Sequence, residues 1–195
     1  MDGFERRKEQ KKESIRRAAL ELFQNYGFKK VSVNDIAQRA GVSQVTIYNH
    51  FTNKDALTRD VLQWYAMILV ARYKSMIESD RPFQEKLEDI VFDKSEVVSQ
   101  FQGELIKTWM QNDPSMQAFI EDLYTNHVMP VARNLFQEGL QQGYIDRRFS
   151  LETIMYYFEI FRRGFFSSPE ISEQAERNPA LIKGLIELMT YGLNG

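Results

Sequence analysis

A run of side chains that can donate or accept hydrogen bonds lies between residues 43 and 54. Amide and hydroxyl groups match the edges of DNA bases, and charged or hydroxyl groups also suit phosphate oxygens. Val45, an apolar residue within the run, could contact a thymine methyl group. The polar candidates for DNA contact are Ser43, Gln44, Thr46, Tyr48, Asn49, His50 and Lys54. This combination indicates DNA recognition.

Two short predicted helices position the run. Ser32 can cap the first helix, Asp35 stands three residues later as in a capping box, and Gly41 ends the helix. Ser43 can cap the second helix. Two short helices joined by a glycine turn are typical of a helix-turn-helix, whose second helix enters the major groove. Many helical proteins contain such a corner, so the pattern alone leaves a purely structural role open.

Helical periodicity dominates the whole chain. Apolar residues recur on one face over residues 15–26, and Gly27 ends that helix. A longer helix is expected over residues 53–78. We therefore predict an all-α protein with a three-helix DNA-binding head containing the helix-turn-helix over residues 1–52. A larger helical body over residues 53–195 is expected to bind ligand and to dimerise.

Five short motifs occur in order between residues 35 and 57. They are Asp35-Ile36-Ala37, Ala40-Gly41-Val42-Ser43, Thr46-Ile47-Tyr48, His50-Phe51 and Asn53-Lys54-Asp55-Ala56-Leu57. Together they resemble the N-terminal signature of the TetR family of bacterial repressors. The resemblance runs from near Ser14 to Leu62. It implies an all-helical dimer with two DNA-reading heads and a regulatory body.

The same resemblance implies roles for single residues. Gln44 is expected to read a base, because an amide can pair bidentately with adenine. The expected phosphate contacts are Ser32, Thr46, Tyr48, His50 and Lys54. The complete predicted DNA-binding set is Ser32, Ser43, Gln44, Val45, Thr46, Tyr48, Asn49, His50 and Lys54. For Tyr48 and His50, packing in the core is the alternative. The residues expected to hold the corner together are Ile36, Ala37, Ile47 and Phe51.

The body is expected to enclose a mostly apolar pocket for a small-molecule effector. Its aromatic content favours a hydrophobic or planar ligand, although each of these side chains could instead belong to the core. The predicted ligand-binding residues are Trp64, Tyr65, Phe101, Trp109, Tyr124, His127, Phe158, Phe161 and Arg162.

Three further features shape the body. Pro130 should kink or divide the helix that begins at Pro114, and the glycines at 139 and 143 should close it. The helices expected over residues 150–166 and 179–193 are apolar on more than one side, so a second subunit would cover the excess. The predicted dimer contacts are Ile154, Phe158, Phe165, Leu181, Leu185 and Leu188.

Composition narrows the functional classes. The net charge is −2, but residues 1–60 hold 12 basic and 8 acidic side chains, so the N-terminal part is the candidate partner of nucleic acid. The chain has no cysteine, no apolar run long enough for a membrane span, and no secretion signal. We therefore expect a cytoplasmic protein without a membrane partner.

Sequence motifs for catalysis are missing as well. The chain has no Gly-x-Ser-x-Gly elbow, phosphate loop or His-Glu-x-x-His motif, so we predict no enzyme, cofactor or metal site. The prediction is a transcriptional repressor that binds a palindromic operator as a homodimer and is released by its effector. The alternative is an adaptor of the same fold that acts through protein contacts.

Overall fold

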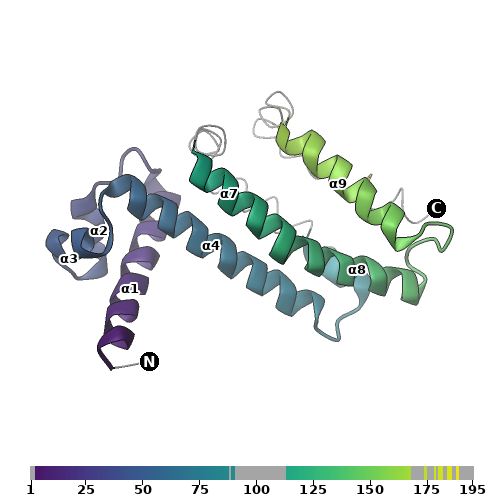
Figure 1. Ribbon diagram of the computed structural model, residues 1–195, viewed down its shortest axis with the longest axis horizontal. Coiled ribbons are helices and arrows are strands. Elements are labelled where there is room, and N and C mark those ends of the chain that lie inside the picture. The colour runs from purple at the N-terminus through teal and green to yellow at the C-terminus, as the bar shows by residue number, and fades with distance from the viewer. Residues whose placement is uncertain are drawn as a thin grey trace. The chain divides into compact units, whose positions relative to one another are not determined.

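The computed structural model describes residues 3–87, 89–90 and 113–167, together with 174, 178, 180, 181, 184, 185 and 188. All regular structure within these residues is helical, which confirms the predicted fold class (Figure 1). None of the helices in this part of the chain is long and apolar enough to cross a membrane. The chain divides into two compact units. The described residues of the first are 3–69 and 113–119, and the second contains the others.

The first unit is built around α1 (Gly3–Tyr26), α2 (Val33–Ala40), α3 (Gln44–His50) and the start of α4 (Lys54–Ile77). Each of these helices contributes one face to the core of this unit. Phe23 and Phe28 lie with their ring centroids 4.7 Å apart. The other buried apolar residues in helices α1 to α4 of this unit are Ile15, Ala18, Ala19, Ile36, Ala37, Ile47, Leu57, Val61 and Leu62, and Val31 and Phe51 lie between helices. The predicted core role of Ile36, Ala37, Ile47 and Phe51 is thereby confirmed.

Local capping defines the two short helices as the sequence predicted. The Asp35 backbone N–H donates to Ser32 Oγ, and the Ser32 N–H donates to the Asp35 carboxylate, which completes the capping box of α2. Gly41 ends α2 with φ 67°, a left-handed conformation that glycine adopts without strain. Ser43 Oγ accepts from the Thr46 N–H at the start of α3.

The second unit contains the end of α4, a π-helical segment η1 (Leu123–Val128), α8 (Met129–Gln142) and α9 (Leu151–Ser167). Helix α7 (Pro114–Asp122) runs directly into η1. The Met129 N–H donates to the Tyr124 carbonyl five residues earlier, and Pro130 follows with no N–H to donate. The predicted division of this helix at Pro130 is confirmed, as is its end at Gly143, where φ is 80°.

The core of the second unit gathers side chains from α4, α8 and α9 and from residues 83 and 145. Its buried members are Ile77, Phe83, Leu135, Phe136, Ile145, Ile154 and Met155. The Phe83 ring stacks on Tyr144, with centroids 5.3 Å apart. Gly139 allows this arrangement, because a Cβ there would lie 2.7 Å from Phe83 Cζ and 2.8 Å from Ile145 Cδ1.

Gly139→Ala is therefore expected to destabilise the protein, by about 1–2 kcal/mol, because overpacking costs more than the helix propensity that alanine adds. Chemical denaturation followed by circular dichroism would measure the change. Asn134→Ala adds alanine at an exposed position of the same helix and should leave stability equal or slightly higher. A Gly139→Ala protein as stable as the control would show that Phe83 moves aside freely.

An ion pair between Lys86 and Glu138 lies in the second unit, with the lysine buried. Lys86 is 3% exposed, and its Nζ lies 2.8 and 2.9 Å from the two carboxylate oxygens of Glu138 on α8. Gln142 Nε2 donates to the same carboxylate at 3.0 Å. These bonds partly replace the water that both charges lose on burial.

Candidate nucleic-acid interface

Helix α3 exposes one face and buries the other. Gln44, Val45, Tyr48 and Asn49 are exposed, with Val45 at 67% and Tyr48 at 50% of their full accessible surface. Ile47, on the opposite face, is 1% exposed and packs in the core. The exposed residues follow the i, i+1, i+4, i+5 spacing of a single helix face. Core packing, the alternative for Tyr48, does not account for a side chain of this exposure.

One hydrogen bond between α2 and α3, and one contact at the start of α3, orient part of that face. Gln44 Nε2 donates to Asn34 Oδ1 at 2.8 Å. The Ser43 and Thr46 hydroxyl oxygens lie 2.9 Å apart. Asn34 was absent from the predicted site, although its exposure on α2 and its contact with Gln44 place it beside the candidate base reader. The sequence alone does not indicate this contact, because the two residues lie ten positions apart on different helices and meet only in the tertiary structure.

Lys54 and Ser32, two further predicted phosphate contacts, also have structural partners. Lys54 is half-buried and its Nζ donates to the Phe28 carbonyl at 2.7 Å, which ties the start of α4 to the loop before α2. An ammonium has three donors, so this bond leaves capacity for phosphate. The Ser32 hydroxyl donates to Asp35 Oδ2 at 2.7 Å, and these bonds from Ser32 hold the pKa of Asp35 below its usual value.

A network of ion pairs connects α1 to α4. Asp60 Oδ1 lies 2.5 Å from Arg16 Nε, and Asp60 Oδ2 lies 2.8 Å from Lys12 Nζ. Burial raises the pKa of Asp60, but the hydrogen bonds and charges of Arg16 and Lys12 outweigh it, so the pKa lies below its usual value. Lys12 Nζ also lies 5.5 Å from the centroid of the Phe51 ring. The network fixes α1 against the residues that follow α3.

His50, the last residue of α3, is half-buried in a basic environment. Burial lowers its pKa, and the charges of Lys8, Lys12 and Lys11 lower it further, while Glu9 acts weakly in the other direction. The imidazole is therefore mainly neutral at neutral pH, when it carries one donor and one acceptor. A neutral ring can hydrogen-bond a phosphate only through its N–H.

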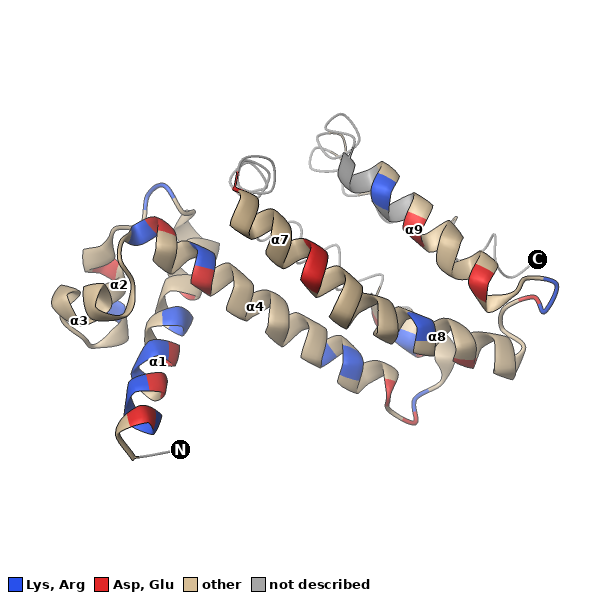
Figure 2. Cartoon of the chain, viewed as in Figure 1, with Lys and Arg blue, Asp and Glu red and all other residues tan. Residues whose placement is uncertain are grey.

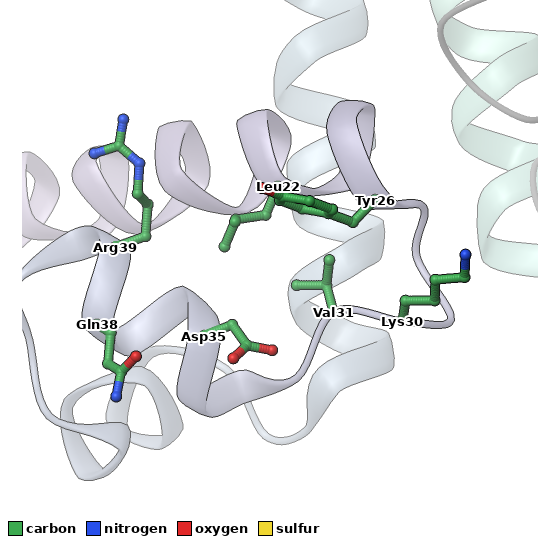
Figure 3. Close-up of a pocket in the computed structure, with 7 residues that line it drawn as sticks. All are labelled: Leu22, Tyr26, Lys30, Val31, Asp35, Gln38 and Arg39. Carbon is green, nitrogen blue, oxygen red and sulfur yellow. The ribbon is translucent and has the colours of Figure 1, made fainter.

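The first unit also has a surface pocket of about 550 Å³, and no residue of α3 lines it. Figure 3 shows its lining on α1, α2 and the segment between them, which comprises Leu22, Tyr26, Lys30, Val31, Asp35, Gln38 and Arg39. None of the predicted effector residues lines it. The Arg39 guanidinium is held by Glu21, with Nη2 2.6 Å from Oε2.

The predicted effector residues are spread over the chain. Trp64 and Tyr65 are half-buried on α4, and Tyr124 and His127 are half-buried on η1. The Phe158 ring packs edge-on against Phe136, with centroids 5.6 Å apart. Phe101 and Trp109 lie outside the described residues, as do the side chains of Phe161 and Arg162. Their role in ligand binding stays a prediction.

Helix α9 separates its apolar residues onto two faces. Ile154 is 1% exposed and lies in the core, and Phe158 packs against that core, so the chain itself covers these two predicted dimer contacts. The other face carries Tyr156, 69% exposed, and Ile160, 69% exposed, with Tyr157 beside them. The predicted set missed this exposed face. Helical periodicity shows two apolar faces, but not which one the chain itself covers.

The other predicted dimer contacts lie near the C-terminus. Leu188 is 71% exposed, whereas Leu181 and Leu185 are half-buried. The Phe165 side chain lies outside the described residues. A contact between subunits through any of these residues stays a prediction.

Known proteins share both the head and the whole fold. Residues 15–61 match the family model described as bacterial regulatory proteins, tetR family. The repressor KstR2 of Mycobacterium tuberculosis is 23% identical over 131 residues, which cover 65% of this chain and 64% of that protein. The match thus spans slightly less than two thirds of the relative. The helix-turn-helix of α2 and α3 lies within the residues that the family model matches.

Residues 15–61 of the chain thus match the DNA-binding head of the TetR family. Among solved structures of this fold, the fatty acid degradation regulator FadR from Bacillus halodurans has a TM-score of 0.61 and 21% identity, covering 94% of this chain and 96% of that chain. FadR from Bacillus subtilis, in complex with stearoyl-CoA, has a TM-score of 0.57 and 19% identity, covering 92% and 97%. At these identities the likeness establishes the shared TetR-type fold, including the parts outside the head.

Proposed function

We propose that this protein is a transcriptional repressor that binds a palindromic DNA operator as a homodimer and is released by a hydrophobic small molecule. The exposed face of α3 carries the proposal. It joins amides, hydroxyls and one valine on a helix whose opposite face is fixed in the core by Ile47. A rigid helix with such a face suits the major groove.

In this proposal the exposed side chains divide into readers and positioning groups. Gln44 pairs with an adenine edge, and Val45 contacts a thymine methyl group. The hydroxyls of Thr46 and Tyr48 and the Lys54 ammonium hold phosphates and fix the register of the helix. The bond between Gln44 and Asn34 supports this arrangement, because an amide held before binding loses less conformational freedom when it meets the base.

The exposed apolar face of α9 supports the homodimer. Tyr156 and Ile160 would leave a large apolar surface in water in a single subunit. A second copy that covers this face would bring two heads together, and two heads can read two half-sites of a palindrome.

For the effector, the proposal is a molecule with a long apolar part. The structural neighbour from Bacillus subtilis was solved with stearoyl-CoA, which makes acyl thioesters the first class to test. The protein would leave DNA if the effector binds better to a form whose two heads are wrongly spaced for successive major grooves. A coupling free energy of about 1–3 kcal/mol between effector binding and DNA binding would be sufficient.

The test is selection of bound sequences from random duplex DNA by the purified full chain, repeated at two salt concentrations and with stearoyl-CoA added. We expect a palindrome to be enriched, binding to weaken as salt rises, and stearoyl-CoA to reduce it. No enrichment in any of these conditions would contradict DNA recognition and favour the adaptor.

A matched pair of variants tests the reading role of α3. Gln44→Ala is expected to weaken binding to the enriched duplex by about 10- to 100-fold, equivalent to about 1–3 kcal/mol, and to relax selection at one base position. Gln38→Ala removes the same group from an exposed site on α2 and should leave affinity unchanged. Fluorescence anisotropy titrations would measure both. Equal affinities for the two variants would exclude Gln44 as a base reader.

A further inference from the structure

The first turns of α1 extend beyond the part of the chain that defines the family. The family model begins at residue 15, whereas α1 begins at Gly3, and every residue from Gly3 to Lys11 is exposed. These turns bury no side chain in the core. Figure 2 shows basic and acidic residues interleaved along them, so their average charge hides any difference between faces.

The helical register separates the charges. Lys8 and Lys11 lie seven and four residues before Ile15, which is 0% exposed, so both lysines share the side of α1 that enters the core one or two turns later. Arg6 lies nine residues before Ile15, on the opposite side of α1. Arg17 shares that side, where its Nη2 pairs with Glu13 at 2.6 Å.

The lysine side of α1 lies close to the end of α3. Lys12 Nζ contacts the ring of Phe51, the residue directly after α3, with 5.5 Å to the centroid. The charges of Lys8 and Lys11 are also strong enough at His50 to lower its pKa, after burial as the larger cause. The contact of Lys12 and the helical register place this side of α1 beside the last turn of the helix proposed to read DNA, and the effect of Lys8 and Lys11 on His50 agrees with that placement.

Two of the nearby acids are already occupied. Glu9 Oε1 lies 3.0 Å from Arg16 Nη1, and the Asp60 carboxylate is shared by Arg16 and Lys12. Among the residues that the structure describes, no carboxylate pairs with Lys8 or Lys11. Lysines three or four positions apart on a helix repel one another, so this cluster weakens α1 unless an anion neutralises it.

We propose that Lys8 and Lys11 extend the phosphate contact expected of His50 into a binding site for DNA phosphates beside the major-groove contact of α3. The site rests on the proposed function, since a helix seated in the groove brings the sugar-phosphate backbone against the protein at its end. The anions that would contact these lysines are therefore the phosphates of the DNA backbone. The contact adds affinity without sequence preference, because phosphates are the same at every position.

The test compares two charge variants of the full chain on two probes. Lys8→Ala/Lys11→Ala removes the lysine pair, and Arg6→Ala removes an exposed cation from the opposite side of the same turns. The probes are the duplex enriched by selection and a mixed-sequence duplex. Titrations over a series of salt concentrations would give the slope of log affinity against log salt.

We expect the double variant to reduce the steepness of that slope by about 0.9 for each lost phosphate contact, hence by about 2 per head. Its affinity should fall by the same factor on both probes. Arg6→Ala should retain the original slope, and circular dichroism should show equal helicity for all proteins. The contrast with Gln44→Ala, which should act mainly on the enriched duplex, separates this site from base reading.

Three outcomes would overturn the site. The slope could stay unchanged in the double variant, Arg6→Ala could lower it equally, or the loss could be confined to one probe. If the unaltered protein bound neither probe, the proposed function itself would fail, and this result differs from all three.

Discussion

Glu138→Ala is expected to lower the free energy of unfolding by about 3–5 kcal/mol, because it leaves the Lys86 ammonium buried without its counter-charge. Lys86 is 3% exposed, and Glu138 accepts both of its short contacts, at 2.8 and 2.9 Å. The loss should appear as a lower denaturation midpoint in urea, followed by circular dichroism.

The surface pair of Arg81 and Glu85 provides the control. Both side chains are about half exposed, and Arg81 Nη2 lies 3.2 Å from Glu85 Oε2. Glu85→Ala should therefore cost no more than about 1 kcal/mol. Lys86→Met/Glu138→Leu, which removes both charges and keeps apolar volume, should recover most of the stability lost in Glu138→Ala. Equal costs for Glu138→Ala and Glu85→Ala would show that Lys86 reaches water when its partner is lost.

Ile160→Glu is expected to convert the proposed dimer into a monomer and to weaken operator binding by about 10²- to 10⁴-fold. The magnitude follows from the loss of linkage between two heads, since each half-site must then be bound separately. Ile160 is 69% exposed, so the substitution should not disturb the core of a single subunit. Analytical ultracentrifugation would give the oligomeric state, and anisotropy titration the affinity for the enriched duplex.

Gln141→Glu is the matched control, because it adds one negative charge at an exposed position of α8, outside the apolar face of α9. It should remain dimeric and bind the duplex normally. A dimeric Ile160→Glu protein would move the interface to another surface. A monomeric variant with unchanged affinity for the palindrome would instead contradict the two-headed binding mode.

Several features could be predicted because they depend on residues close together in the sequence. Ser32 and Asp35 form their capping box within one helical turn, and Gly41 ends α2 through its own backbone conformation. Pro130 divides its helix for an equally local reason, since it lacks the backbone donor that the helix requires. The exposed face of α3 follows from the short spacing around Ile47.

Other features depend on residues that meet only in the folded chain. The sequence predicted that α9 is apolar on several sides. Ile154 and Ile160 are the same residue type, so the sequence does not show which of the two is buried. Ile154 is buried because it packs in a core with residues of α8 and with Phe83. From the sequence alone, Lys86 is a charged residue expected at the surface. In the folded chain it pairs with Glu138, 52 positions away.

The sequence by itself therefore determined the helices, their caps and the helix-turn-helix, because backbone hydrogen bonding and side-chain periodicity act over a few residues. The tertiary structure decided which apolar face stays exposed, which lysines lie beside His50, and which charges are paired. These depend on distances between helices, for example from Asp60 to Lys12, and such distances are set by the core as a whole.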